Sequence, residues 1–259
     1  MASTSADQTR PEGNHSLSTP VRFLILSDTH GAKLPENLPP CDVLLHCGDL
    51  TEDGTPESIS LALQHLGKVK ANLKLVISGN HEISLDKSYW LSQGGEEDRF
   101  NSAGTPSWAQ NVGTETSTIP NNVDIVMTHG PARYILDEIE GHSAGCEHLR
   151  RAIARVQPRL HCFGHIHSPR RGFYEAHVLR HEGQTVLEGD PIGSISKVWM
   201  GENSCRKKGF RSLTAGAAQE FRENKQQTLC VNAAMEGDEP GVLEHPPWLV
   251  KLDLPVQTL

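Results

Sequence analysis

Five short motifs of metal-binding type follow one another along the chain. They are Asp28-Thr29-His30, Gly48-Asp49, Gly79-Asn80-His81-Glu82, His129-Gly130 and Gly164-His165-Ile166-His167. Their side chains offer carboxylate, amide and imidazole donors, a mixture that suits metal ions of intermediate hardness. Donors from separate places are enough for two adjacent cations, and two adjacent cations suit the hydrolysis of a phosphate ester. The candidate metal ligands are Asp28, His30, Asp49, Asn80, His129, His165 and His167.

The spacing within the motifs predicts how these donors are presented. Asp28 and His30 flank a single residue, and residues two apart in an extended link point to the same side, so we expect both to meet one metal ion. The same reasoning applies to His165 and His167. Asp49 is the natural bridge between two cations because a carboxylate has two oxygens. An amide oxygen, as in Asn80, can hold an ion without adding charge.

The elements that must position these residues are short apolar runs followed by glycine or a polar residue. Runs rich in Val, Ile and Leu, which predict strands of a sheet buried on both faces, lie at 21–26, 43–47, 73–77, 123–127 and 160–163. Two further strands are predicted at 228–233 and 248–254. Amphipathic helices are predicted at 56–69 and 146–156, which place apolar residues on one face. Alternating strands and helices favour an α/β domain.

Each motif comes directly after a predicted strand. Asp28 follows VRFLIL, Asp49 follows VLLHC, Asn80 follows LKLVIS, His129 follows VDIVMT and His165 follows LHCFG. Ligands of open α/β sheets gather beyond the carboxyl ends of the strands. A lone histidine or aspartate at a strand end is usually a cap or a solvated residue, but five motifs at one sheet edge indicate a metal centre. The glycines at 48, 79 and 164 would let the backbone approach a ligand closely.

Composition sets wider limits on function. The chain has 259 residues, with 36% hydrophobic and 22% charged residues, which is ordinary for a globular protein of one large domain. A formal net charge of −8 argues against nucleic acid as the main partner. None of the six cysteines lies in a C-x-x-C pair, which argues against a structural zinc site. Several of them lie inside apolar runs, which favours a reducing compartment. No secretory signal and no apolar run of membrane-spanning length is present, so we expect a cytoplasmic protein without a membrane anchor.

Competing chemistries have little support in the sequence. There is no P-loop, no G-x-G-x-x-G dinucleotide fingerprint and no G-x-S-x-G nucleophile elbow. Among histidines outside the motifs, His46 and His161 lie inside predicted strands, where we expect each to be satisfied by a hydrogen bond. We expect the remaining ones to lie on the surface, and these are His15, His65, His142, His148, His177, His181 and His245.

The ordered set D-x-H, G-D, G-N-H-E, H-G and G-H-x-H resembles the calcineurin-like metallophosphoesterase superfamily. The longer wording, including RFLILSDTH, DVLLHCGDLTEDG, LVISGNHEISLD and the C-terminal TLCVNA, is similar to its metallophosphoesterase-domain-containing branch, and to fungal members in particular. The resemblance covers about residues 21–259. It implies a four-layer sandwich of two mixed β-sheets flanked by helices, formed by one domain over 21–259 after a disordered tail over 1–20.

The resemblance also implies the roles of the site residues. Asp28, His30, Asp49 and His167 would hold one metal ion, and Asp49, Asn80, His129 and His165 would hold the other. His81 would be a catalytic residue, with Glu82 supporting it. The expected cofactors are two divalent metal ions, drawn from Mn²⁺, Fe and Zn²⁺. The expected reaction is hydrolysis of a small phosphodiester, with cyclic nucleotides among the substrates, by a hydroxide that the metal ions activate.

The sequence departs from the branch in three places. The interval from Ile83 to Thr128 is short, and its weakly patterned part covers 84–120. Ser168-Pro169 follows the last motif where Glu-Gly is more usual, and 168–227 reads as a loop-rich insertion. A lost sheet element in the short interval would open the site. This favours a second hypothesis, a metal- or nucleotide-binding regulatory module with little turnover. A nuclease is a third, which the negative charge disfavours.

Overall fold

Two mixed sheets form the framework in the computed structural model, which describes residues 18–85, 119–167, 176–180, 195–198, 205 and 207–255. The first sheet has the strand order β11-β1-β2-β3 and the second has β4-β7-β10-β8-β9. Their strands are β1 (Ser18–Leu26), β2 (Val43–His46), β3 (Leu73–Val76), β4 (Ile125–Met127), β7 (Leu160–Phe163), β8 (Ala176–Arg180), β9 (Ile195–Val198), β10 (Gln227–Asn232) and β11 (Trp248–Pro255). A small hairpin joins β5 (Glu138–Ile139) to β6 (His142–Ser143).

Both sheets combine parallel and antiparallel pairs. In the first sheet β1, β2 and β3 run parallel, and β11 lies antiparallel to β1. In the second sheet β4, β7 and β10 run parallel, and β8 and β9 are antiparallel neighbours. The parallel strands of each sheet therefore deliver the residues that follow them to one edge. This arrangement is what brings the predicted motifs together.

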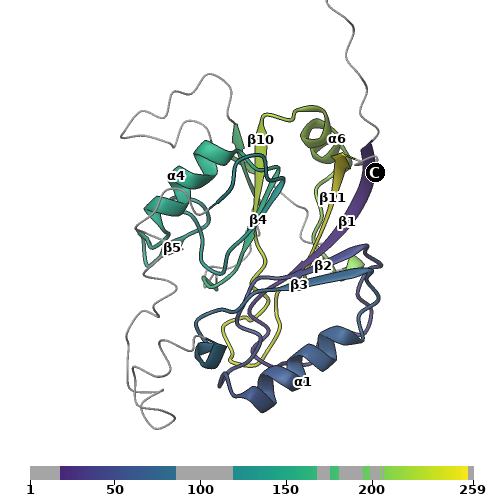
Figure 1. Cartoon of the computed structure of the whole chain (residues 1–259), viewed down its shortest axis with the longest axis vertical. Coiled ribbons are helices and arrows are strands. Elements are labelled where there is room, and N and C mark those ends of the chain that lie inside the picture. Colours follow the sequence, from purple (N-terminus) through teal and green to yellow (C-terminus); the bar gives the residue numbers. More distant parts are fainter. Residues whose placement is uncertain are drawn as a thin grey trace, which may run out of the picture.

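Three hydrophobic clusters fill the spaces between four layers. The largest joins the facing sides of the two sheets, with Phe23 and Trp248 from the first sheet and Leu229 from the second. The helix α1 (Pro56–Gly67) covers the outer face of the first sheet through Ala62 and Leu66. The helix α4 (Glu147–Val156) covers the second sheet through Leu149 and Ile153. Figure 1 shows α1 and α4 on opposite sides of the two sheets. The predicted four-layer sandwich is confirmed.

Local chemistry explains where the helices begin. Thr55 caps α1, because its side chain accepts a hydrogen bond from the backbone N–H of Ser58, and Pro56 follows at the first helical position. Thr214 caps α6 (Ala215–Glu223) in the same way, accepting from Ala217. A single turn of 3₁₀-helix, η1 (Ile83–Leu85), follows the Gly79–Glu82 motif.

Two sequence predictions need correction. The run at 73–77 was expected to be buried on both faces, but β3 alternates between exposed and half-buried residues because it lies at an edge of its sheet among the described strands. The predicted loop-rich insertion at 168–227 contains β8, β9 and α6. Of the predicted tail over 1–20, residues 18–20 belong to β1, and the rest lies outside the described residues. Most of the weakly patterned segment 84–120 lies outside them as well.

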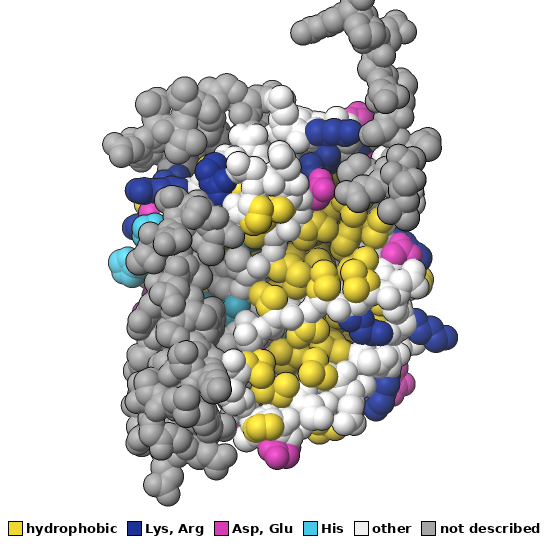
Figure 2. Space-filling view, in the orientation of Figure 1, with side chains coloured by type: hydrophobic (Ala, Val, Ile, Leu, Met, Phe, Trp, Pro, Cys, Tyr) yellow, Lys and Arg dark blue, Asp and Glu magenta, His cyan; other side chains and the backbone are white. Residues whose placement is uncertain are grey.

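The edge position of β3 has a visible consequence. Leu73 and Leu75 pair with Val43 and Leu45 of β2, so they extend the apolar face that meets the second sheet. Leu73 and Leu75 are nevertheless 49% and 45% exposed. Figure 2 shows hydrophobic side chains gathered in the middle of the side of the molecule that it draws, where Figure 1 places β2 and β3.

None of the described helices is long and apolar enough to cross a membrane.

Candidate metal centre

The loops after β1 and β2 are joined by their backbones. The N–H of Asp28 donates to the carbonyl of Gly48 over 3.0 Å, and those of Thr29 and His30 donate to the carbonyl of Asp49 over 3.0 and 3.1 Å. On the second sheet, the N–H of Gly164 donates to the carbonyl of His129 over 2.8 Å. These bonds align the ends of neighbouring parallel strands, so that the side chains which follow each strand lie close together.

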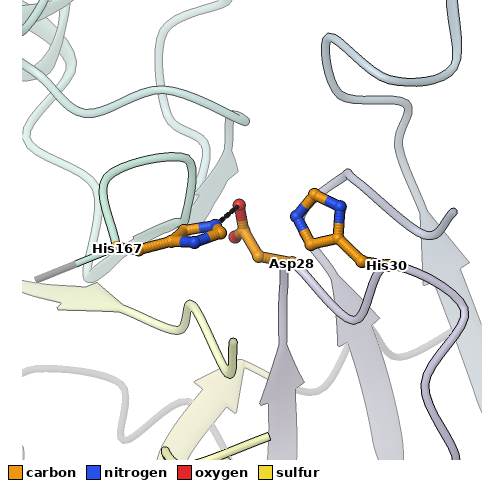
Figure 3. A group of neighbouring side chains, drawn as sticks. All are labelled: Asp28, His30 and His167. Atoms are coloured by element: carbon orange, nitrogen blue, oxygen red, sulfur yellow. Dashed lines mark hydrogen bonds and ion pairs between the residues drawn. The ribbon is translucent and has the colours of Figure 1, made fainter. Parts of the chain in front are cut away.

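The first donor cluster consists of Asp28, His30 and His167, whose candidate ligand atoms lie within 4.8 Å of one another. Nε2 of His167 lies 3.0 Å from Oδ1 of Asp28. Figure 3 shows the imidazoles of His30 and His167 on either side of the Asp28 carboxylate. The backbone N–H of His165 also reaches both oxygens of Asp28, at 3.0 Å each. The cluster therefore joins residues that follow β1 to residues that follow β7.

The second cluster consists of Asp49, His129 and His165, again with candidate ligand atoms within 4.8 Å. Nδ1 of His129 lies 2.9 Å from the carbonyl oxygen of Cys47, which can only accept a hydrogen bond, so Nδ1 carries a proton. The other nitrogen, Nε2, faces Oδ2 of Asp49 at 3.1 Å and Oδ1 of Asn80 at 2.9 Å. Asn80 thus joins this cluster, and three donor atoms converge on one point.

The clusters separate Asp28, His30 and His167 from Asp49, His129 and His165. The full ligand sets that the family resemblance implies, with Asp49 in both, stay predictions. His165 and His167, however, fall into different clusters, so the prediction that they meet one metal ion because of their spacing is wrong. The ring of His165 lies beside His129, with the centroids 4.9 Å apart, whereas His167 lies beside His30 at 5.4 Å. That Asp49 bridges two cations stays a prediction.

The backbone at the clusters is in the left-handed region. Asp28, His30, Asp49 and His165 have φ angles of 52°, 45°, 50° and 70°. The expected extended link between Asp28 and His30 is therefore wrong, although both side chains do reach the same cluster. A non-glycine residue in this region is destabilised, and such residues concentrate at functional sites. The surrounding backbone bonds hold these four residues in a conformation that aims their side chains at one another.

Two glycines allow the loops to approach so closely. A Cβ atom on Gly79 would collide with Oδ1 and the backbone nitrogen of Asp49. A Cβ atom on Gly164 would collide with Oδ2 of Asp28 and with the side chain of Ser27. Neither glycine has a positive φ, so its role here is space and not backbone freedom. Both glycines therefore bring the backbone close to the carboxylates of Asp49 and Asp28, whereas the predicted close approach to a ligand stays a prediction.

Electrostatics show that the clusters suit a cation. Asp28 and Asp49 are almost fully buried carboxylates. Burial alone lowers the pKa of His129, but its hydrogen bond to Asp49 and the charges of Asp49 and Asp28 outweigh burial and raise the pKa to about 9. Burial alone raises the pKa of Asp49. The hydrogen bond from His129, the positive charge of that imidazole and the hydrogen bond from the backbone N–H of His81 outweigh burial and lower the pKa to about 2. A protonated imidazole thus supplies positive charge that a bound metal ion would otherwise provide.

The buried imidazole of His30 also supports a cation site. Its two nitrogens make no well-aligned hydrogen bond within the described chain. Carboxylate oxygens nevertheless lie near both: Glu52 at 2.9 Å from Nδ1 and Glu236 at 3.5 Å from Nε2. Buried polar atoms are normally paired, so His30 has ligand capacity that the described chain does not use. Together with the aspartates and His167, this donor set fits a divalent cation of intermediate hardness.

His81 lies beside the first cluster, with its ring centroid 4.6 Å from that of His30. Its Nδ1 lies 2.6 Å from the carbonyl oxygen of Glu52, so Nδ1 donates and Nε2 is the atom left for other chemistry. Its backbone N–H donates to Oδ1 of Asp49. Glu82 is buried, and it accepts from the backbone of Thr51 and Gly79 and from the hydroxyl of Thr51. Glu82 therefore fixes the loop that carries His81 and makes no described hydrogen bond to its ring.

Comparison with protein families identifies the relatives of this chain. The family model described as calcineurin-like phosphoesterase matches residues 21–169, which include all seven candidate ligands and His81. The chain belongs to the calcineurin-like phosphoesterase family.

Three individual proteins show what this chain is similar to within and beyond that family model. Metallophosphoesterase domain-containing protein 1 of Homo sapiens is 31% identical over 197 residues, covering 57% of this chain and 60% of that protein. The Emericella nidulans protein named "Probable rhamnogalacturonate lyase C" is 36% identical over 182 residues, which are 57% of this chain but 17% of that protein. A 3′,5′-cyclic-nucleotide phosphodiesterase of a Nostoc species is 29% identical over 190 residues, covering 63% of this chain and 68% of that protein. The chain thus spans less than two thirds of the first two relatives.

Two carboxylates near the clusters of this phosphoesterase were not predicted from the sequence. Glu52 lies three residues after Asp49 and faces Nδ1 of His30. Glu236 follows β10 and lies near both His30 and His167. The only sequence signal for Glu236 is its place shortly after a strand of the second sheet. That signal is weak, because many strands are followed by an acidic residue.

The other histidines mostly match expectation. His46 and His161 are buried, and their Nε2 atoms lie 3.0 Å from the hydroxyl of Thr29 and 2.9 Å from that of Thr128. The expected hydrogen bond is thus present at Nε2 of each ring, but Nδ1 of each is buried without a partner among the described residues. His177 was expected at the surface, but this is wrong, since it is buried in β8. His15 and His181 lie outside the described residues.

Proposed function

We propose that this protein is a phosphodiesterase that binds two divalent metal ions and hydrolyses a small phosphodiester. Mn²⁺ is the ion that we would test first. The observation that carries the proposal is the pair of donor clusters built around two buried carboxylates, with His81 beside them. Two adjacent clusters, each formed by residues that follow strands of both sheets, suit the clamp that two metal ions place on a phosphate ester. A binding module would need neither the second cluster nor an adjacent histidine with an available nitrogen.

Each side chain has a definite part in this proposal. Asp28, His30, Asp49 and His167 would hold one ion, and Asp49, Asn80, His129 and His165 would hold the other. Bound there, two divalent ions would supply Lewis acidity, which lowers the pKa of a water molecule and screens the charge of phosphate oxygens. The carbonyl of Cys47 fixes the tautomer of His129, so that Nε2 points at Asp49 and Asn80.

His81 is the proposed catalytic residue. The carbonyl of Glu52 accepts from its Nδ1, and the Asp49 carboxylate accepts from its backbone N–H, so the ring and the backbone of His81 are each anchored at one point. Its Nε2 is the atom that would donate a proton to the leaving oxygen or a hydrogen bond to a phosphate oxygen. General acid catalysis by a placed imidazole contributes a factor of roughly 10²–10⁴ in rate.

Cyclic nucleotides are the substrates that we would test first. The Nostoc relative is named a 3′,5′-cyclic-nucleotide phosphodiesterase, and it is matched over 68% of its length. A phosphodiester carries one negative charge, which the paired cations would offset. Nucleic acid is a weaker choice, because the net charge of this chain is −8.

The deciding experiment is turnover of bis(p-nitrophenyl) phosphate by the purified full chain. It would be run with Mn²⁺, with a chelator, and with Asp49→Asn. Asp253→Asn is the matched control, because Asp253 is an exposed carboxylate on β11. We expect turnover that needs Mn²⁺, is lost with Asp49→Asn and survives in Asp253→Asn. Two metal ions per chain without turnover would favour a regulatory module, and no bound metal would overturn the proposal.

A further inference from the structure

The carboxylate of Glu236 lies between two imidazoles of the first donor cluster. Its Oε2 atom is 3.4 Å from Nδ1 of His167 and 3.5 Å from Nε2 of His30. The residue is only 7% exposed. Among the described residues these two histidines are its only ion-pair partners within 4.0 Å. A buried carboxylate is costly unless it is paired, so this arrangement calls for a role.

The backbone fixes where Glu236 lies. The chain leaves β10 in the second sheet and runs beside the end of β1 in the first, where Ala234 pairs with Ser27. The N–H of Met235 donates to the carbonyl of Ser27 over 3.0 Å, and that of Glu236 donates to the carbonyl of Asp28 over 3.2 Å. Glu236 is thus tied to the residue that carries the central carboxylate of the cluster.

The side chain is held as firmly as its backbone. Oε1 of Glu236 accepts a hydrogen bond of 2.6 Å from the backbone N–H of Gly241. That bond uses one carboxylate oxygen and leaves Oε2 to face the two imidazoles. The carboxylate is therefore oriented by contacts that do not depend on a metal ion.

The geometry of His167 shows what this carboxylate would do. Nε2 of His167 lies 3.0 Å from Oδ1 of Asp28, inside the cluster, and Nδ1 faces Glu236 on the other side. A nearby carboxylate favours a proton on the ring nitrogen that faces it, so Asp28 favours a proton on Nε2 and Glu236 favours one on Nδ1. A cation bound at Nε2 would leave Nδ1 as the nitrogen that carries the proton, facing Glu236. With the proton on Nδ1, the lone pair of a neutral imidazole lies on Nε2, where a cation would bind. Carboxylates behind ligand histidines act in this way in metal sites.

We propose that Glu236 is a positioning residue of the first donor cluster. Its carboxylate favours the tautomer of His167 that leaves Nε2 beside Asp28 for a cation, and the same oxygen lies 3.5 Å from Nε2 of His30. This inference rests on the proposed metal centre. It adds a residue that follows β10, a strand that supplies none of the candidate ligands, and it makes Glu236 act through the histidines and not as a ligand.

The test compares Glu236→Gln with the wild-type full chain. Glu244→Gln is the matched control, because Glu244 is an exposed carboxylate of the same loop. Mn²⁺ binding would be measured by equilibrium dialysis with metal analysis. The tautomer of His167 would be read from ¹⁵N NMR of the chain loaded with diamagnetic Zn²⁺, where Nε2 is expected to bind the ion and Nδ1 to carry the proton. We expect a roughly 10–100-fold weaker affinity at one of two sites, with unchanged binding in Glu244→Gln and a wild-type proton on Nδ1.

The outcomes separate the two proposals. If the wild type binds two ions and Glu236→Gln binds them with the same affinity, the positioning role is overturned and the metal centre stands. If the wild type binds no Mn²⁺, the metal centre fails, and the positioning role fails with it. Should Glu236→Gln not fold, the spectrum of the Zn²⁺-loaded wild type decides, since an ion on Nδ1 of His167 with the proton on Nε2 would overturn the role.

Discussion

Asn80 and His129 meet across the two sheets, with Oδ1 of the amide 2.9 Å from Nε2 of the imidazole. Asn80 follows the first sheet, and His129 follows β4 of the second. The amide of Asn80 carries no charge, and the imidazole of His129 is neutral at high pH. A positive charge between these two groups and the Asp49 carboxylate would therefore favour their close approach. A proton on Nε2 of His129 would supply that charge, and in the proposed metal centre a bound cation would supply it.

Asn80→Ala should therefore weaken one of the two proposed metal ions and spare the other. We expect about one Mn²⁺ per chain at concentrations that fill two sites in the wild type, through a loss of affinity of at least about tenfold. Asn72→Ala is the control, because Asn72 is an exposed amide in the loop before β3. Dialysis with metal analysis would give both numbers, and two ions retained in Asn80→Ala would remove Asn80 from the ligand set.

His81→Gln should separate metal binding from turnover. The substitution removes the nitrogen assigned to the substrate but none of the proposed ligands, so we expect two bound ions and a kcat lower by roughly 10²–10⁴. His148→Gln, which changes an exposed histidine on α4, should leave both unchanged. Metal loss in His81→Gln would show that His81 is a ligand, and unchanged kcat would rule out its catalytic role.

Some features of this fold are local enough to be predicted from the sequence. The strand β7 has the predicted bounds, because Leu160–Phe163 is buried at every position and ends at a glycine. The five motifs meet because each follows a parallel strand, and parallel strands end at a common edge. That rule needs only the order of apolar runs and polar endings.

Other features depend on contacts between distant residues. Nothing local shows that His165 takes a φ of 70°, and this turn sends His165 and His167 to different clusters. The position of Glu236 depends on the pairing of Ala234 with Ser27, two residues from different sheets. The apolar pattern of β3 predicts a strand but not its edge position, which depends on what pairs beside it. Residues in such places escape pattern reasoning.

Gly164→Ala should damage the first cluster through steric conflict alone. Its Cβ atom would collide with Oδ2 of Asp28 and with the side chain of Ser27, so we expect a loss of about 1–3 kcal/mol in the free energy of unfolding. Metal affinity at one site should fall as well, because Asp28 must move. Urea titration and metal dialysis would measure the two effects.

The matched control for this change is Gly216→Ala in α6, where a Cβ atom meets nothing within 4 Å. Alanine favours helix over glycine by up to about 1 kcal/mol, so this variant should be as stable as the wild type or slightly more stable. Equal stability of Gly164→Ala and the wild type would mean that the loop at Gly164 yields easily, which the close approach to Asp28 does not predict.

His161 should make the stability of the protein depend on pH. The residue is fully buried in β7, and burial lowers the pKa of its imidazole to about 3, from an ordinary value near 6.5. Below pH 6.5 the unfolded chain binds a proton on this ring and the folded chain does not. The contribution is therefore fully present above pH 6.5 and is lost progressively as the pH falls toward 3.

Between pH 7 and pH 5 this linkage should reduce the free energy of unfolding by about 2 kcal/mol. His161→Phe removes the titrating ring and places another aromatic ring beside Phe163, whose centroid lies 4.8 Å from that of His161. Urea titrations of both proteins at pH 7, 6 and 5, with chelator present, would isolate the effect as the difference between the two slopes. Parallel stability curves would mean that the folded protein accepts a proton on His161 at little cost, against its burial in β7.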